Sequence, residues 1–538
     1  MMYHCWMLRK TLNAGCLTDR QCTKVFIIYK LRNLIYTKMK SYTNYMNSIT
    51  EDELYKGLLV YGMFSDKLPP VFSMEDFWDY LISKQPSFSK GDHDFIYYES
   101  IKNNGIPRPF GIPAPMAYQR LCEGLKNNWS KLQQHFKETT ATHPYKISRI
   151  HIRKIRDTEK IFEMNYKKWW IDSEPQLDLQ IGAKYVVRSD ISTCFPSIYS
   201  HSIPWALVGK DYAKDHRGNK EWFNAIDKLC CTTKNGETHG LLIGPHTSNL
   251  ISEIILCAVD QKLAPFYKYV RNIDDYECYV STYEEGEHFI SDLNIALREY
   301  DLSLNRKKTC IEKLPIASSS HWVHQIKNAI TIQLEGHIIK RKHIQSFLDT
   351  VIQLVDHNDD AAALKYAMRV IKDKELEENA VDYYIKTILH LSFIYPYIVP
   401  LLKEYVFDSF IIDREVLEKF INKLYSDAIN TMKYEVLYYS LYFAVQYNFE
   451  LDSFNIDDCL KREDCLFKFF SWLYCKQHKK NPELEKLKDE AKGLKVIRKN
   501  SMDRYWIYVY EALSDVDLNG EWKNLKRSGV SFLKPEYR

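Results

Sequence analysis

The chain has 538 residues, of which 45% are hydrophobic and 27% are charged, and its formal net charge is +4. This length predicts several domains rather than a single core. The composition excludes a disordered, collagen-like or membrane-dominated chain, and the small net charge means that contacts with nucleic acid depend on local basic patches.

The N-terminal end is basic. Residues 1–45 hold eight Lys and Arg against one acidic residue, whereas the balance is −2 over 46–339 and −1 over 340–538. Basic residues interrupt the apolar stretch of this end, which argues against a signal peptide. We expect a basic extension that either lacks order or precedes the native start, with Met39 and Met46 as alternative starts.

Cysteine usage and hydropathy bear on location. The 13 cysteines are scattered without an even framework or zinc-ligand spacing, which is typical of reduced thiols in a cytosolic protein. The longest apolar run, 388–402, is shorter than a membrane span and contains Pro396 and Pro400. We therefore expect no transmembrane segment and no membrane partner.

The texture of the sequence changes near residue 340. Before this point Pro and Gly punctuate mixed apolar runs, which predicts α+β structure, and after it helical periodicity continues almost throughout. We expect one domain over 46–339 and an α-helical domain of stacked, HEAT-like hairpins over 340–538. The expected helices of the second domain cover about 343–355, 360–373, 378–395, 413–425, 427–447, 457–478, 482–498 and 503–514.

Two acidic features in the first domain accompany short β-branched runs. YVVRSDIS predicts a strand that ends at Asp190, and Asp274 and Asp275 stand between strand-like residues in YKYVRNIDDYECYV. A lone Asp190 is more often a cap or a salt-bridge partner. Adjacent carboxylates, however, are poor strand formers that repel each other, and such a local violation usually marks a site. Because magnesium ions offset this repulsion, we predict carboxylates that bind Mg²⁺.

The alternation of strand residues suggests how these carboxylates are used. Unless a hairpin turn falls at the pair, only one of the two adjacent residues fully enters the site, and we expect Asp274 to be the stronger ligand with Asp275 in support. Asp190 is then the third carboxylate of a two-metal centre. Its ions, about 4 Å apart, clamp the attacking and leaving oxygens of a phosphoryl displacement.

Four segments stand in the order and spacing of motifs A to D of reverse transcriptases: DISTCFPSIYSH, GLLIGPHTSNLISEIIL, RNIDDY and LSLNRKKTCI. The set resembles the bacterial antiphage reverse transcriptases of the abortive-infection and defence-associated (unknown-group) class, and IPRPFGIPAP and KISRIHIRKI are similar to the preceding fingers motifs. The resemblance covers roughly residues 50–335. It implies the right-hand fingers and palm of a reverse transcriptase, followed by an all-α helical-repeat domain in place of a thumb.

The resemblance assigns roles to the matching residues. Asp190, Asp274 and Asp275 align with the catalytic, metal-binding triad, and Ile191 would contribute its backbone carbonyl. Phe195 falls at the position of the aromatic gate that senses the sugar. A phenyl ring under the ribose would clash with a 2′-hydroxyl and so select deoxynucleotides; an ordinary core Phe is the alternative.

The other motifs supply contacts to nucleotide and strand. Gly244, Pro245 and Ser248 match the motif B turn, where a residue without a side chain lets the backbone approach base or template. Lys308 suits charge neutralisation at the triphosphate, with a solvated turn as the alternative. Asn272 stands where the usual motif C carries an aromatic residue, so primer engagement is expected to differ.

Two basic segments are candidates for further contacts. Arg108 lies between two prolines and, by the resemblance, contacts the incoming triphosphate or the template, with a surface Arg in a turn as the alternative. KISRIHIRKI alternates basic and apolar residues, which predicts a strand with one basic face suited to a phosphate backbone. Arg149 and Arg153 are our candidates for template or nucleotide contact.

Together with these residues, the resemblance implies an enzyme of the bacterial cytoplasm, an RNA-directed or template-independent DNA polymerase that uses two Mg²⁺ ions, or Mn²⁺, in antiphage defence. The resemblance also implies deoxynucleoside triphosphate substrates, an RNA partner such as a dedicated noncoding RNA, and a homo-oligomer. It further implies priming on a Tyr hydroxyl, which leaves the DNA product covalently attached; the sequence does not single out that Tyr. The alternatives are a catalytically idle nucleic-acid-binding scaffold and a metal-dependent phosphoesterase.

Overall fold

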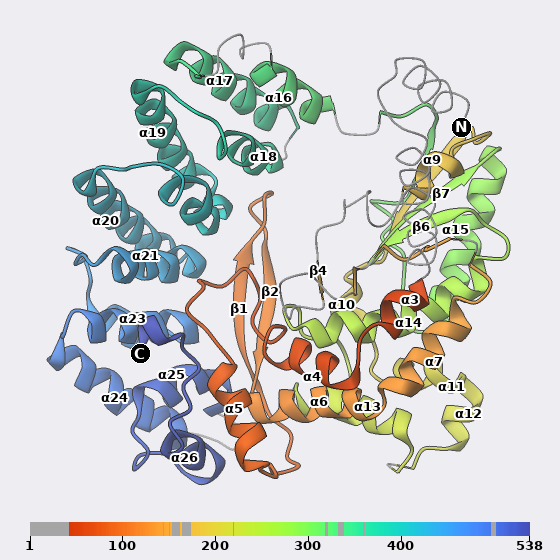
Figure 1. The fold of residues 1–538 in the computed structure, drawn as a ribbon, viewed down its shortest axis with the longest axis horizontal. Coiled ribbons are helices and arrows are strands. Elements are labelled where there is room, and N and C mark those ends of the chain that lie inside the picture. The colour runs from red at the N-terminus through yellow and green to blue at the C-terminus, as the bar shows by residue number, and fades with distance from the viewer. Residues whose placement is uncertain are drawn as a thin grey trace, which may run out of the picture. The chain divides into compact units, whose positions relative to one another are not determined.

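The computed structural model describes residues 42–143, 145–149, 151–152, 162–163, 174–218, 220–317, 321–331, 338–358, 361–496 and 502–538 (Figure 1). The chain forms two compact units. The first unit holds residues up to Leu54, Trp129–Ser192 and Glu253–Leu314, and the second holds Tyr55–Asn128, Thr193–Ser252 and Pro315–Arg538. The second unit thus combines residues from both sides of position 340, and the domain limits expected from the sequence stay a prediction.

The first unit is built on a four-stranded sheet whose strand order is β6-β7-β5-β8. Every neighbouring pair in it is antiparallel. The strands are β5 (Tyr185–Asp190), β6 (Tyr269–Asn272), β7 (Asp275–Val280) and β8 (Cys310–Lys313). The central strand β5 ends at Asp190, as the sequence predicts.

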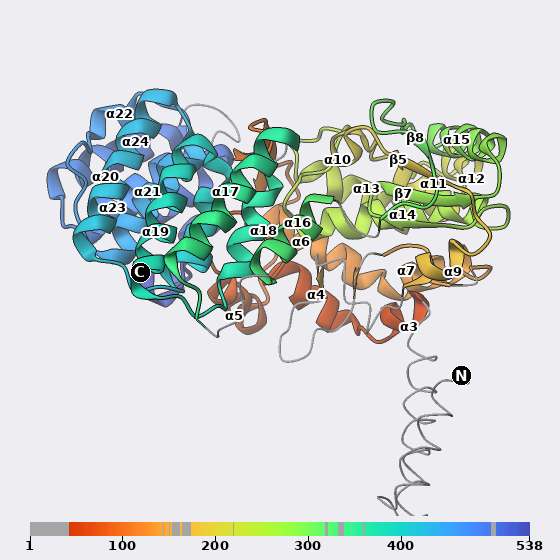
Figure 2. The ribbon, with the colours of Figure 1, turned by 90° about the horizontal axis from the view of Figure 1, so that it is seen from above.

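Helix α15 (Tyr283–Arg298) lies against β5, β7 and β8 (Figure 2). Val186 and Val187 are buried in the middle of β5, where β-branched side chains pack well on a pleated surface. Gly286 allows the helix to come this close, because a Cβ there would stand 3.0 Å from Ile311 Cδ1 and 3.1 Å from Val187 Cγ2. The sheet end that carries Asp190 is therefore anchored on a packed helix–sheet layer.

Further segments complete the first unit. Residues 147–149 run beside β6, since Arg271 N donates to Ile147 O at 3.0 Å and Arg149 N donates to Arg271 O at 2.7 Å. Tyr45 of α3 is buried although it falls within the expected N-terminal extension, most of which lies outside the described residues. The remaining elements are α3 (Tyr42–Asn47), α7 (Trp129–Thr139), α9 (Pro175–Leu179), β3 (His151–Ile152) and β4 (Phe162–Glu163), while α4 (Glu51–Leu59) and α14 (His246–Leu263) have residues in both units.

The second unit begins with an antiparallel hairpin and a group of helices. The hairpin is β1 (Phe95–Ile101) with β2 (Pro107–Pro113), so the proline-rich IPRPFGIP segment is a strand rather than a loop. Its helices before α14 are α5 (Glu75–Lys84), α6 (Pro115–Asn127), α10 (Cys194–Ser197), α11 (Ser202–Val208), α12 (Lys210–Asp215) and α13 (Trp222–Thr232).

Helices follow one another through the rest of the second unit, and no strand is assigned among its described residues after 314 (Figure 1). Pairs such as α20 with α21 and α21 with α23 pack side by side. The elements are α16 (His321–Thr331), α17 (Arg341–Asn358), α18 (Ala362–Ile371), α19 (Glu378–Ile394), η1 (Pro396–Leu401), η2 (Lys403–Phe407), α20 (Arg414–Thr431), α21 (Tyr434–Tyr447), α22 (Ile456–Leu460), α23 (Cys465–Gln477), α24 (Asn481–Val496), η3 (Met502–Tyr505), α25 (Trp506–Ala512), α26 (Gly520–Arg527) and η4 (Pro535–Tyr537).

The expected helices of this region need two corrections. The break expected at 426 lies instead after Thr431, where Met432 takes a left-handed φ of 55° and ends α20. The single helix expected over 457–478 is divided into α22 and α23. Asp464 starts the second of these, because its side chain accepts a hydrogen bond from Phe467 N at 2.7 Å.

Buried carboxylates join the late helices to the β1–β2 hairpin within the second unit. Glu435 of α21, 2% exposed, accepts from Ile101 N at 2.7 Å. Asp503 of η3 accepts from Asp94 N at 3.1 Å, and Asp94 pairs with Arg504 at 2.6 Å. Residues on both sides of position 340 therefore share one core.

Two properties of the described residues complete the fold. Ten of the cysteines lie there, and all of them are free. None of the described helices combines the length and the apolar character that crossing a bilayer requires.

Candidate active site

Three carboxylates meet at one end of the sheet in the first unit. Asp190, the last residue of β5, is the direct cross-strand partner of Asp275, the first residue of β7. Asp274 lies in the turn between β6 and β7, and its carbonyl oxygen accepts a hydrogen bond from Ile191 N at 3.1 Å. Like charges directly opposite each other destabilise a sheet. The pairing of these carboxylates therefore indicates a functional site rather than a contribution to stability.

The turn that carries Asp274 is strained. Ile273 has a φ of 58°, a left-handed conformation that a β-branched residue rarely takes and that costs on the order of 1–3 kcal/mol. The turn falls at Ile273 and Asp274, so strand alternation does not decide which of the two adjacent carboxylates enters the site. Strain of this kind is kept where the surrounding structure holds it in place.

A buried ionic network holds this turn. Arg271, fully buried, donates from Nη1 to Ile273 O at 3.0 Å. It also bonds Asp260 from Nε at 2.9 Å and Glu253 from Nη1 at 3.0 Å, and both acids are fully buried. Burial by itself lowers the pKa of Arg271, but Asp260 and Glu253 outweigh burial and raise that pKa well above its usual value. The guanidinium is thus permanently charged beneath the acidic turn.

Sequence reasoning missed this network, although a signal for it exists. Glu253 and Asp260 are seven residues apart, on one face of a helix whose Leu250, Ile254 and Cys257 form a buried apolar stripe. Two acids within a buried face require a buried cation. The sequence could have indicated that a cation is needed, but not that Arg271 supplies it.

The turn after Leu304 wraps around Asp190. Lys308 Nζ bonds Asp190 Oδ2 at 2.6 Å, and Asn305 Nδ2 donates to Asp190 Oδ1 at 3.1 Å. Asn305 N also donates to Asp190 O at 2.7 Å. The hydrogen bond to Asp190 raises the pKa of Lys308, whose side chain remains 62% exposed. Lys308 therefore points toward the acidic site. The alternative of a solvated turn fits its exposed neighbour Lys307 better.

The electrostatics of the site favour a cation. Partial burial, together with repulsion from Asp274 and Asp190, raises the pKa of Asp275 to about 7, and Lys308 opposes this rise. As the side chains stand, no group of three or more His, Cys, Asp or Glu within the described ranges is disposed to hold a metal ion, and both oxygens of Asp190 are engaged. The donor set, carboxylates crowded at one point, nevertheless matches the oxygen ligands that Mg²⁺ prefers.

The motif B segment lies in the second unit. Gly244 has a φ of +124°, a conformation that side chains rarely tolerate. The segment is fastened to β2, since Gly111 N donates to Ile243 O at 3.0 Å, and a Cβ on Gly111 would stand 2.8 Å from Leu242 Cδ2. Ser248 is buried in the first turn of α14, which begins at His246.

Phe195 belongs to the same part of the second unit. It is half-buried in α10, and its carbonyl oxygen accepts a hydrogen bond from Leu241 N at 2.8 Å. The backbone pairing continues with Gly240 N to Ile198 O at 2.8 Å. The structure therefore ties residues 195–198 within motif A to the segment before Gly244, and the role of Phe195 as a sugar gate stays a prediction.

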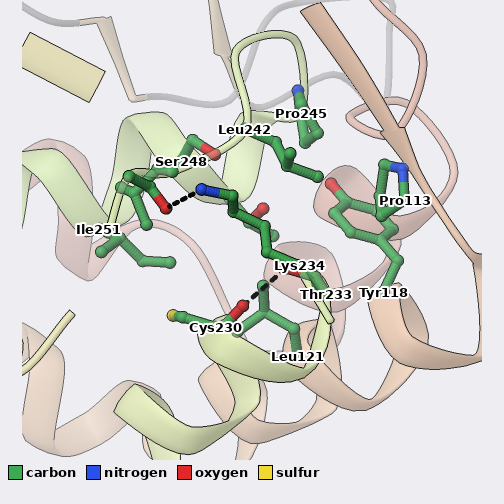
Figure 3. A pocket seen from close by; sticks show the side chains of 13 residues that line it. Pro113, Tyr118, Leu121, Cys230, Thr233, Lys234, Leu242, Pro245, Ser248 and Ile251 are labelled. Atoms are coloured by element: carbon green, nitrogen blue, oxygen red, sulfur yellow. Dashed lines mark hydrogen bonds between the residues drawn. The ribbon is translucent and has the colours of Figure 1, made fainter. Parts of the chain in front are cut away.

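A small pocket of about 10 Å³ lies beneath the motif B turn, with room for roughly one water molecule. Pro245 and Ser248 line it, and so does Lys234, which the sequence reasoning did not select. Figure 3 shows the Lys234 side chain in this pocket, where Nζ donates to Gly240 O at 3.1 Å. Burial lowers the pKa of Lys234. This lysine fixes the carbonyls that lead into the turn.

The remaining candidates are placed as follows. Arg108 is exposed on β2 opposite Ser100, and Asn272 ends β6 opposite Asp275. The backbone of Arg149 pairs with β6, and the residue is only 4% exposed. The prediction of an open basic face is therefore wrong at this position. Arg153 lies outside the described residues.

Comparisons with known proteins give a limited result. No family model and no curated protein matches the chain. The matching solved structures include telomerases. One is apo telomerase from Candida tropicalis truncated from its C-terminal domain, with 13% identity and a TM-score of 0.29 over 46% of this chain and 56% of that one. The apo telomerase of the same organism has 11% identity and a TM-score of 0.29 over 70% and 69% of the two chains. Telomerase from Candida albicans with a fragment of telomeric RNA has 11% identity and a TM-score of 0.27 over 77% and 67%.

This chain spans 56% of the first of these telomerases. Likeness at such scores assigns no residue and no activity.

Proposed function

We propose that the chain is a metal-dependent nucleotidyltransferase of the reverse-transcriptase type, which adds deoxynucleotides to a primer. One observation carries the proposal: Asp190 and Asp275 are cross-strand partners beside the Asp274 turn, at the end of a central strand, with Lys308 bonded to Asp190. Three carboxylates and one lysine at a single point form the charge pattern that phosphoryl transfer uses. The four ordered motifs of the sequence support the same reading.

In this proposal Asp190, Asp274 and Asp275 would hold Mg²⁺ or Mn²⁺, together with the carbonyl of Ile191. The bound ions supply charge neutralisation at the attacking and leaving oxygens. Lys308 holds a proton and a positive charge beside the carboxylates, and can meet the negative charge of a triphosphate. Gly244 keeps the approach to base or template free of side chains, and Phe195 would exclude a 2′-hydroxyl.

The biological setting of the proposal comes from the motif resemblance. It comprises synthesis on an RNA template or without one, initiation on a Tyr hydroxyl, assembly as a homo-oligomer, and a role in bacterial antiphage defence within the cytoplasm. RNA and deoxynucleoside triphosphates would be the partners. Nothing among the described residues identifies which Tyr would be the primer.

The test uses the purified full chain with Mg²⁺ or Mn²⁺ and each labelled deoxynucleoside triphosphate, with and without RNA. We expect incorporation in the wild type and its loss in Asp190→Ala and Asp274→Ala. Synthesis retained by both variants would contradict the proposal. Nucleic-acid binding without incorporation in the wild type would favour the idle scaffold, and phosphate release without incorporation would favour a phosphoesterase.

The same reactions test priming. Product that migrates with the protein until protease is added indicates a covalent link to the chain. Free product contradicts priming on a Tyr hydroxyl, and a requirement for RNA identifies a templated reaction.

A further inference from the structure

A second cavity, of about 490 Å³, lies in the second unit among helices α11, α12 and α13. We call it the α11–α13 pocket. Its volume falls within the range of small-molecule sites in proteins. It shares no residue with Asp190, Asp274, Asp275 or the motif B turn, so the inference drawn from it does not depend on the proposed function.

One wall of the α11–α13 pocket is aromatic. The Tyr199 ring lies 5.8 Å from Trp205 and 4.8 Å from His201, in both cases edge to face. Tyr199 and Trp205 are half-buried, so part of each ring remains open to solvent. Lys210 Nζ stands 4.2 Å from the centre of the Trp205 ring. This wall offers aromatic surface, with the Lys210 ammonium over the Trp205 ring.

The rim of the pocket is basic. Lys214, Arg217 and Lys228 line the pocket and are exposed. Arg217 Nε donates to Lys214 O at 2.8 Å, which holds the Arg217 side chain at the last turn of α12, where Lys214 lies. Lys228 Nζ lies 3.3 Å from Asp92, in an exposed pair that contributes little and leaves the ammonium free to turn.

The acidic side chain among the described lining residues does not cancel this charge. Asp227 is buried at the floor of the pocket and pairs with His201, with 2.5 Å between Nδ1 and Oδ2. Its other oxygen lies 3.6 Å from Cys231 Sγ. The carboxylate is thus occupied by partners within the protein, whereas the three cations are exposed.

An aromatic wall next to a basic rim recognises a planar ring joined to a phosphate. Bases stack on Trp and Tyr with little regard to sequence, and Lys and Arg bind the phosphate. We propose that the α11–α13 pocket binds a nucleoside phosphate, either as a free nucleotide or as one residue of a single-stranded nucleic acid. Trp205 and Tyr199 would contact the base, and Lys214, Arg217 and Lys228 the phosphate.

The test measures binding by the full chain in EDTA, so that metal-dependent binding at the Asp190 site does not contribute. The probes are AMP and dAMP, followed by calorimetry, and fluorescein-labelled oligoadenylate and oligodeoxyadenylate, followed by anisotropy. We expect saturable binding that the double variant Lys214→Glu/Arg217→Glu weakens by about tenfold or more, because two phosphate-binding cations become repulsive. Both residues are exposed, so this variant should fold.

The matched control reverses two other exposed lysines of the same unit, in Lys84→Glu/Lys90→Glu, and should change the dissociation constants by less than about twofold. Trp205→Leu should weaken binding as well, by about fivefold or more, since the base loses a ring on which it stacks. Equal effects of the two charge reversals, or no binding of any probe by the wild type, would overturn the proposal.

The probes also separate the two sources of the ligand. If the oligomers bind no more tightly than the mononucleotides, the pocket is assigned to free nucleotides. Tighter, salt-dependent binding of the oligomers that is lost in Lys214→Glu/Arg217→Glu assigns it to a strand.

Discussion

The acidic turn of the first unit and the motif B turn of the second both take backbone conformations that most side chains tolerate poorly, but they are supported in different ways. The Ile273 turn rests on buried charge, because Arg271 bonds its carbonyl and is itself held by Glu253 and Asp260. The Gly244 turn rests on shape, through its backbone conformation and the close packing of Gly111 on Leu242. A turn that presents carboxylates needs a nearby positive charge, whereas a turn that admits a ligand needs the absence of a side chain.

Among substitutions in the two turns and their supports, Arg271→Met should lower the free energy of unfolding the most. Loss of the guanidinium leaves Glu253 and Asp260 buried without a cation, and breaking a buried pair in this way costs about 3–5 kcal/mol. Chemical denaturation measures this loss. Arg298→Met, at an exposed position, serves as the control.

A rescue separates the charge from the shape of that residue. Adding Glu253→Gln and Asp260→Asn to Arg271→Met removes the unpaired charges and should restore part of the stability. A cost below about 1 kcal/mol for Arg271→Met would mean that the network does not support the turn.

Lys308→Gln should lower deoxynucleotide incorporation by about ten- to a hundredfold, since Asp190 loses its bonded cation and the triphosphate loses a positive charge. Single-turnover incorporation at saturating nucleotide measures the effect. Lys307→Gln, at the exposed neighbour, should change the rate by less than about twofold. Equal rates for the two variants would show that the bond to Asp190 has no role in the reaction.

Gly244→Ala should destabilise the second unit by about 1–3 kcal/mol, because a side chain at a φ of +124° is strained. Gly493→Ala is the matched control. Its added Cβ meets nothing within 4 Å inside α24, so it should stabilise by about 0.5–1 kcal/mol. Thermal unfolding compares the two, and an unchanged melting temperature for Gly244→Ala would contradict the strain argument.

Glu435 should make the stability of the second unit depend on pH. Burial raises the pKa of Glu435 from 4.5 to about 7, so the folded chain binds more protons here than the unfolded chain between these values. Stability from this group is therefore fully present below pH 4.5 and is lost as the pH rises through about 7. The melting temperature of Glu435→Gln minus that of the wild type should therefore be larger at pH 8 than at pH 5. For the exposed Glu415→Gln this difference should be the same at both pH values.

Much of the fold and part of the site could be predicted from the sequence. The strand that ends at Asp190, the buried face of α14 and most helices after position 340 follow from local periodicity. The two-residue turn at Ile273 could not be predicted in the same way, because β-branched residues disfavour the left-handed backbone conformation that this turn requires. The burial of Arg149 also did not follow, since alternating basic residues predict an open face.

What the sequence determined by itself is the chemical inventory and its local order: three carboxylates beside strands, a lysine after them, a glycine turn before a helix, and a basic N-terminal end. The tertiary structure decided which of these groups meet. It paired Asp190 with Asp275, turned Lys308 onto Asp190, placed Arg271 under the acidic turn, and joined Glu435 to the β1–β2 hairpin. The physical reason is that propensity and periodicity act over a few residues, whereas a buried charge or a crowded carboxylate is satisfied by partners far away in the chain.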